Sequence, residues 1–147
     1  MPNGLDTALD VARKFDIDEA IDLYTSKIEV ADWVAVKSRH LEEFRESWAH
    51  AIPVERMKQL LHHDYTKAVL LLGKDAKKFT ESLIKIEREL SKNGFPKAFA
   101  LAAGPQEGAP HEIRPSMETC GIDALGTLKK FKKNVDSCPP MGIVLLE

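Results

Sequence analysis

One stretch of the chain, residues 67–102, most restricts the folds that are open to it. Lys67 to Gly73 is a continuous apolar run that ends at a glycine, which is typical of a strand covered on both faces. Asp75 then caps a long amphipathic helix over residues 76–91. A second apolar strand, 98–102, follows at once. Strand, helix and strand in this order predict a βαβ unit with two neighbouring parallel strands.

Apolar spacing and breaking residues predict further helices and strands on both sides of this unit. The helices are expected at residues 5–15, 38–49, 53–61 and 125–131, with another helix start near Pro115 and Ser116. The strands are expected at residues 20–25, continued through Ile28 and Val30, and at 142–146. We therefore expect a single α/β domain, residues 1–147, with a mostly parallel central sheet of about four strands and helices packed on it.

Composition narrows the class of partner. The chain has 21 basic and 23 acidic residues and a net charge of −2, so it has no general attraction to nucleic acid or to an anionic membrane. Its apolar runs fall short of the roughly 20 residues that a membrane span needs. Two cysteines in 147 residues indicate a reducing compartment without a disulfide framework, and we expect a cytoplasmic protein.

A polar segment after the second strand of the βαβ unit concentrates chemically capable side chains. Gly104-Pro105 ends the strand, and the segment then carries His111, Glu112, Arg114, Ser116, Glu118 and Cys120. Ligand crevices in parallel sheets lie at the carboxyl ends of the strands. Because Lys74 follows the first strand of the unit, we expect it to share this edge with the polar segment.

Two interpretations of this edge stay open. Arg114 and the amides near Ser116 would favour an anion at a helix N-terminus, and Lys74 would join them. Alternatively, Arg114 and Glu118 pair with each other and cap the turn. The ligand-binding candidates are accordingly Lys74, His111, Arg114, Ser116 and Glu118.

Metal or nucleophilic chemistry would use other members of the same segment. His111, Glu112 and Cys120 are the weak metal candidates, and His111 could activate Cys120 as a nucleophile. The chain has no C-x-x-C motif. We therefore expect no cofactor, with zinc or an iron–sulfur cluster as the alternative, and we assign no catalytic residue. Four other histidines are expected on the surface, namely His40, His50, His62 and His63.

Three stretches of the chain resemble a family described as predicted metal-binding proteins, the cysteine-rich domain of unknown function 2284. Residues 30–37 are similar to the segment that leads to the family's first cysteine cluster. Residues 97–105 resemble the strand and Ala-Gly-Pro turn before its second cluster. Residues 114–123, with the string Arg-Pro-Ser-Met-Glu, resemble the segment after that cluster.

The expected cluster ligands are absent from the matching positions. Where the family has cysteines, this chain has Ser38, Glu42, Trp48 and Ala51, and the insert of the second cluster is reduced to residues 106–110. The family's Cys-Pro-Pro corresponds to Ala51-Ile52-Pro53. The resemblance thus implies a divergent member that lacks the cysteine clusters, and metal binding does not carry over to it residue by residue.

These observations give two function hypotheses. The first is a non-enzymatic binding or accessory protein that has lost its cluster, with a small anion or a protein as partner. The second is a metal-dependent or cysteine-dependent enzyme that uses His111, Glu112 and Cys120. Trp33, Phe44 and Trp48 are expected to pack in the core, and the alternative is that they form the contact of a homodimer.

Overall fold

Four strands form the centre of the fold. The computed structural model describes residues 4–15, 17–40, 52–103, 116–132 and 139–147. The strands are β1 (Glu19–Tyr24), β2 (Lys67–Leu72), β3 (Phe99–Ala102) and β4 (Met141–Leu145), and their order in the sheet is β1-β2-β4-β3. The α-helices are α1 (Gly4–Arg13), α2 (Asp32–Arg39), α4 (Val54–Gln59), α5 (Ala76–Lys92) and α6 (Ala124–Lys129). A 3-10 turn, η1 (Thr25–Lys27), follows β1, and a π-helical turn, η3 (Leu60–Asp64), follows α4.

The sheet is antiparallel, so the prediction of a mostly parallel sheet is wrong. β4 lies between β2 and β3 and pairs antiparallel with both, and β1 pairs antiparallel with β2. β2 and β3 therefore run in the same direction, as a βαβ unit requires, but they are not neighbours. All five residues of β4 are buried. A strand buried on both faces needs a partner on each side for its backbone groups, and the position between β2 and β3 supplies both.

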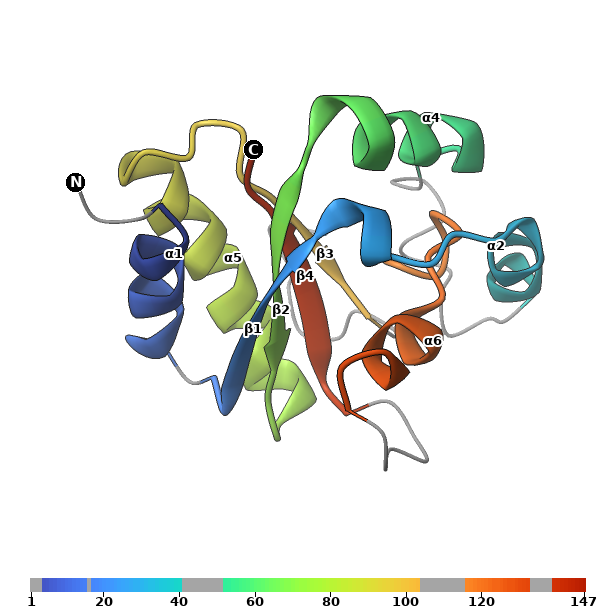
Figure 1. Cartoon of the computed structure of the whole chain (residues 1–147). Helices are drawn as coiled ribbons and strands as arrows, with labels where there is room; N and C mark the ends of the chain where they lie inside the picture. Colours follow the sequence, from blue (N-terminus) through green and yellow to red (C-terminus); the bar gives the residue numbers. More distant parts are fainter. Residues whose placement is uncertain (1–3, 16, 41–51, 104–115, 133–138) are drawn as a thin grey trace.

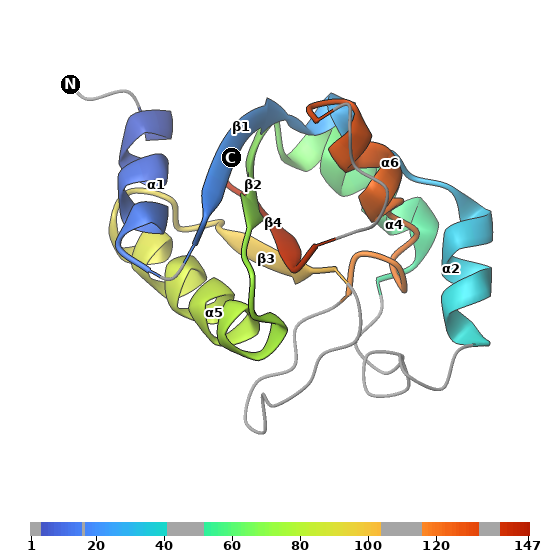
Figure 2. The same cartoon turned by 90° about the horizontal axis from the view of Figure 1, so that it is seen from below.

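The helices cover the two faces of the sheet separately (Figure 1). α1 and α5 lie on one face, where Val11, Phe79, Leu83 and Leu90 pack against Val144 and other sheet residues. α4, η3 and α6 lie on the other face. Figure 2 shows the same arrangement from below, with α1 and α5 on one side of the strands and α6, α4 and α2 on the other. Three layers result, and the alternation of side chains along each strand feeds both cores.

The helix between β2 and β3 forms as the sequence predicted. The carboxylate of Asp75 accepts a hydrogen bond from the amide of Lys78 at 3.2 Å, which satisfies one of the free amides of the first turn. The stripe of Phe79, Leu83, Ile86 and Leu90 is buried. Gly94, with φ of +100°, follows the end of the helix in the left-handed conformation that glycine favours.

Two predictions for the segment between β1 and α4 are wrong. Ile28 and Val30 do not continue β1, because the chain turns through η1 after Tyr24. Helix α2 begins at Asp32 and not at Ser38. The apolar string at 33–36 resembled a strand, but only Val34 and Ala35 are buried there, as a helix packed on one face requires. The remainder of the predicted 38–49 helix from residue 41 on lies outside the described residues.

The predicted helix start near Ser116 is instead a turn. Residues 117–121 form hydrogen-bonded turns, and Gly121, with φ of +89°, ends them. The next helix begins after Asp123, whose carboxylate accepts a hydrogen bond from the Gly126 amide at 2.9 Å. This helix, α6, ends at Lys129, which confirms the second helical stretch of this region but shortens it.

Candidate functional site

Residues 116–123, which we call the connecting segment, begin at the carboxyl end of β3. Ser116 forms an isolated parallel bridge with Ala102, the last residue of that strand. The amide of Met117 donates a hydrogen bond to the carbonyl of Ala102 at 2.7 Å. The described part of the polar segment is therefore fixed at the carboxyl end of β3, where the sequence placed the ligand candidates.

The same segment is tied to the chain before α2. The Ala31 amide donates to the Gly121 carbonyl at 2.8 Å, and the Asp123 amide donates to the Glu29 carbonyl at 2.8 Å. An antiparallel bridge lies between these two bonds and joins Val30 to Ile122. The described parts of the three stretches on which the family resemblance rests thus lie side by side in space, with the connecting segment between the other two.

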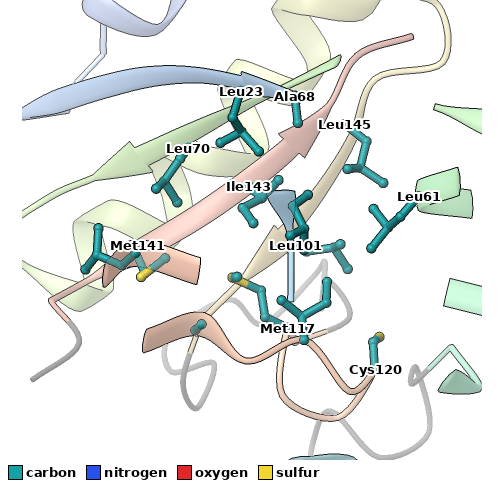
Figure 3. Packing of buried hydrophobic residues seen from close by; sticks show 14 of the residues in the cluster. Leu23, Leu61, Ala68, Leu70, Leu101, Met117, Cys120, Met141, Ile143 and Leu145 are labelled. Carbon is teal, nitrogen blue, oxygen red and sulfur yellow. The ribbon is translucent and has the colours of Figure 1, made fainter. Parts of the chain in front are cut away.

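Cys120 is the reactive residue type in this segment, and it is buried. Its sulfur accepts a hydrogen bond from the amide of Ile52 at 3.3 Å. Figure 3 shows Cys120 in the same packed layer as Met117 and Leu101. Burial raises the pKa of the Cys120 thiol, and the charge of Glu118 adds to the effect. Because the thiolate is the nucleophile, this environment makes Cys120 a poor one at neutral pH.

Ser116 and Thr119 form hydrogen bonds with each other. Their side-chain oxygens lie 2.7 Å apart, the Thr119 amide donates to the Ser116 hydroxyl at 3.1 Å, and the Thr119 hydroxyl donates to the Ser116 carbonyl at 3.2 Å. Both side chains are buried. A network closed in this way stabilises the turn, and it uses donors that an anion at Ser116 would need.

The structure does not bring Lys74 and Ser116 together. Lys74 is exposed after β2, whereas Ser116 adjoins β3, and β4 lies between these two strands. Two strand spacings separate them by about 10 Å at the sheet edge. Glu118 is half-buried beside Ser116. The other three candidates of the loop, His111, Glu112 and Arg114, lie outside the described residues.

The described residues do not fit a metal group of the kind that the family resemblance implies. Within the described ranges, no three of the histidine, cysteine, aspartate and glutamate side chains converge to hold an ion. The resemblance would place one of the family's cysteines at Ser38, whose hydroxyl donates to the Ala35 carbonyl at 2.8 Å inside the buried face of α2. The Cys120 sulfur is likewise engaged with a backbone amide. Glu42, Trp48 and Ala51 lie outside the described residues.

The histidine predictions hold where the structure describes them. His40 is exposed at the end of α2, and His62 and His63 are exposed in η3. His50 lies outside the described residues. These side chains are therefore surface groups, as their sequence context indicated.

Trp33 contradicts the prediction that it packs in the core. Its exposed fraction is 60%, and that of Val36, one turn later on α2, is 54%. The helix buries Val34, Ala35 and Ser38 on its other face, so Trp33 points away from the buried side of α2. Trp48 and Phe44, which the sequence grouped with it, lie outside the described residues.

A shallow hollow that the sequence did not indicate lies where β1 ends and β2 begins. Its volume is about 150 Å³, and Tyr24, Ser26, His62 and Tyr65 are among its lining residues. The Tyr65 hydroxyl donates to the Lys97 carbonyl at 2.6 Å, and burial raises the pKa of Tyr65. The lining residues come from two segments about 40 positions apart, which no short motif reveals.

Comparison with known proteins does not add a function to this geometry. The chain matches no protein-family model, no curated protein and no solved structure. Among the helices of the described ranges, none combines the length and the apolar character that crossing a membrane requires.

Proposed function

We propose that this chain is a non-enzymatic binding protein, a cysteine-depleted relative of the predicted metal-binding family that it resembles. We further propose that it acts through protein contact at the exposed face of α2. The observation that carries this proposal is the exposure of Trp33 and Val36, at 60% and 54%, on one face of that helix. Tryptophan is enriched at the energetic centres of protein interfaces, because its large ring loses much contact with water on binding.

One face of α2 is attached to the rest of the protein, and the opposite face is exposed. Val34, Ala35 and Ser38 are buried and attach the helix to the rest of the protein. Trp33 and Val36 are three residues apart, so they are neighbours on the opposite face. Two adjacent exposed apolar side chains on one helix form a patch, whereas scattered ones are ordinary on any protein surface.

The state of Cys120 supports the non-enzymatic part of the proposal. Its sulfur is buried and hydrogen bonded to Ile52, and its pKa is raised by burial. Activated cysteines have the opposite surroundings, with partial exposure and nearby positive charge. Ser116 and Thr119 also form hydrogen bonds with each other, which is typical of a turn with a structural role.

The partner that best suits the α2 face is a second copy of this chain. Asp32 lies at the start of α2 and Lys37 near its end, and both are exposed. In an antiparallel α2–α2 contact, the acidic end of one helix lies beside the basic end of the other. The two helix dipoles then point in opposite directions, which is a favourable arrangement. A contact centred on one eight-residue helix is small, so we expect a dimer of micromolar affinity.

Replacing Trp33 with alanine is expected to weaken this dimer. Loss of a tryptophan at the centre of an interface costs about 2 kcal/mol or more, and the substitution removes one from each copy, so the dissociation constant should rise at least about 30-fold. Sedimentation velocity over a range of concentrations up to about 500 µM measures the constant directly. Tyr24→Ala is the matched control, because Tyr24 is an aromatic residue with the same exposed fraction of 60% on a different surface.

Two results would contradict the proposal. The wild-type chain could stay monomeric over the whole concentration range, which would remove the second copy as the partner. Alternatively, Trp33→Ala and Tyr24→Ala could weaken the dimer equally, which would show that the contact is not centred on α2.

A further inference from the structure

The two outer edges of the sheet differ in how their backbone groups are satisfied. At the β3 edge, the Ala100 amide donates to the Glu87 carboxylate at 2.6 Å. The Ala102 carbonyl on the same edge accepts from the Met117 amide at 2.7 Å. A side chain of α5 and the connecting segment thus cover the edge that β3 would otherwise present to another strand.

No strand or side chain of the described residues covers the outer edge of β1. The Thr25 amide donates to the Thr66 carbonyl in register with the β1–β2 pairing, so the odd-numbered residues of β1 bond to β2. Ala20, Asp22 and Tyr24 therefore direct their amide and carbonyl groups away from the sheet. Over the residues that the structure describes, these six groups make no hydrogen bond. They form a template to which an extended chain can add.

The charge on this edge indicates what kind of strand it accepts. Asp22 lies at the middle of the edge and is exposed, and it forms no ion pair in the described structure. The other acidic residue of β1, Glu19, is already paired with Lys132, whose Nζ lies 2.6 Å from its carboxylate. An added strand with a lysine or arginine beside Asp22 would gain a cross-strand ion pair.

We propose that the β1 edge binds an extended, basic peptide segment of another protein as a fifth strand, antiparallel to β1. Main-chain hydrogen bonds to Ala20, Asp22 and Tyr24 would hold the peptide, and Asp22 would select a basic side chain. The hollow beside Tyr24, of about 150 Å³, lies at the carboxyl end of β1 and is large enough for one side chain of the peptide. This surface is separate from the α2 face, and the inference does not rest on the proposed dimer.

A second copy of the chain is a poor occupant of this edge. In the antiparallel pairing of two β1 strands that uses all six free groups, Ala20 faces Tyr24 and Asp22 faces Asp22. Like charges directly opposite each other destabilise a strand pair. The acidic centre of β1 therefore disfavours self-association through this edge and favours a basic partner.

The test uses a labelled eight-residue peptide in which lysine and valine alternate, and fluorescence anisotropy measures its binding to the full chain. Asp22→Lys is expected to weaken binding about tenfold, because an attractive cross-strand pair becomes a repulsive one. Asp10→Lys is the matched control. It makes the same change of net charge on α1, where the side chain is 71% exposed, and it should leave binding unchanged.

Methylation of the backbone nitrogens at alternate residues of the peptide separates strand addition from simple charge attraction. The set that faces β1 should abolish binding, whereas the set that faces solvent should not. Equal weakening by Asp22→Lys and Asp10→Lys would overturn the proposal, as would equal binding of the two methylated peptides. Absence of binding by the unmodified peptide would overturn it as well. Because Asp22 is exposed, its replacement should not change the thermal unfolding midpoint, which is measured in parallel.

Discussion

Replacing Gly121 with alanine is expected to destabilise the fold by about 2–5 kcal/mol. Gly121 has φ of +89°, a conformation that costs an L-residue about 1–2 kcal/mol. A Cβ atom at this position would lie 2.8 Å from Cγ2 of Val54 and 3.3 Å from the Ala31 carbonyl oxygen. Overpacking of this kind adds about 1–3 kcal/mol. Urea unfolding followed by circular dichroism measures the change in the free energy of unfolding.

Gly94→Ala is the matched control for this prediction. Gly94 has a similar φ of +100°, but a Cβ atom there would meet nothing within 4 Å. Its replacement should cost only the backbone term of about 1–2 kcal/mol. If Gly121→Ala were no worse than Gly94→Ala, the close packing of the connecting segment against α4 and the chain before α2 would be contradicted.

The second large effect is expected at the centre of the sheet. Ile143→Ala should destabilise the protein by about 2–5 kcal/mol, because Ile143 is fully buried on β4 and the lost methyl groups leave a cavity. Its neighbours in the core include Leu70 and Leu101, which lie opposite it on the two flanking strands. Urea unfolding under the same conditions measures the free energy of unfolding of this variant and of the wild-type chain.

Ile21 supplies the control, because it is also an isoleucine and packs against the same core. It lies on the edge strand β1 and is only partly buried. Ile21→Ala should therefore cost clearly less than Ile143→Ala. Equal costs for the two substitutions would contradict the central position of β4, since a strand at the edge of the sheet would not bury Ile143 so completely.

Local patterns in the sequence predicted most elements, because their causes are local. Residues close together in the sequence specify each of these elements. Examples are the apolar run of residues 67–72 and the stripe of Phe79, Leu83, Ile86 and Leu90. The insertion of β4 between β2 and β3 depends instead on pairing between residues about 40 or more positions apart. The order of strand, helix and strand is the same whether β2 and β3 are neighbours or are separated, so it could not reveal the antiparallel sheet.

The candidate site was predictable in position more than in chemistry. The segment after β3 does lie at the sheet edge, but Ser116 and Cys120 are engaged in internal contacts that depend on Thr119 and on Ile52. The contact with Ile52 joins residues 68 positions apart in the chain. Trp33 was misplaced for a similar reason, because an apolar residue on a short helix gives no sign of which face meets the core.

Neither the open β1 edge nor the covered β3 edge has a signal in the sequence. Glu87 reads as one of several charged residues on a solvated helix, yet its carboxylate accepts the hydrogen bond of the Ala100 amide. Asp22 reads as the polar member of an alternating strand. Their different roles follow from the strand order, which places β3 and β1 at opposite edges of the sheet.

The central claim is that the connecting segment is a structural support and that Cys120 performs no chemistry. It is tested most directly by the reactivity of the Cys120 thiol in a Cys138→Ser variant, where it is the one cysteine left in the chain. A chromogenic thiol reagent at neutral pH should label Cys120 only as fast as the protein unfolds, and denaturant should accelerate the reaction in step with unfolding. Labelling of the folded protein at the rate of the thiol in the unfolded chain would contradict the account.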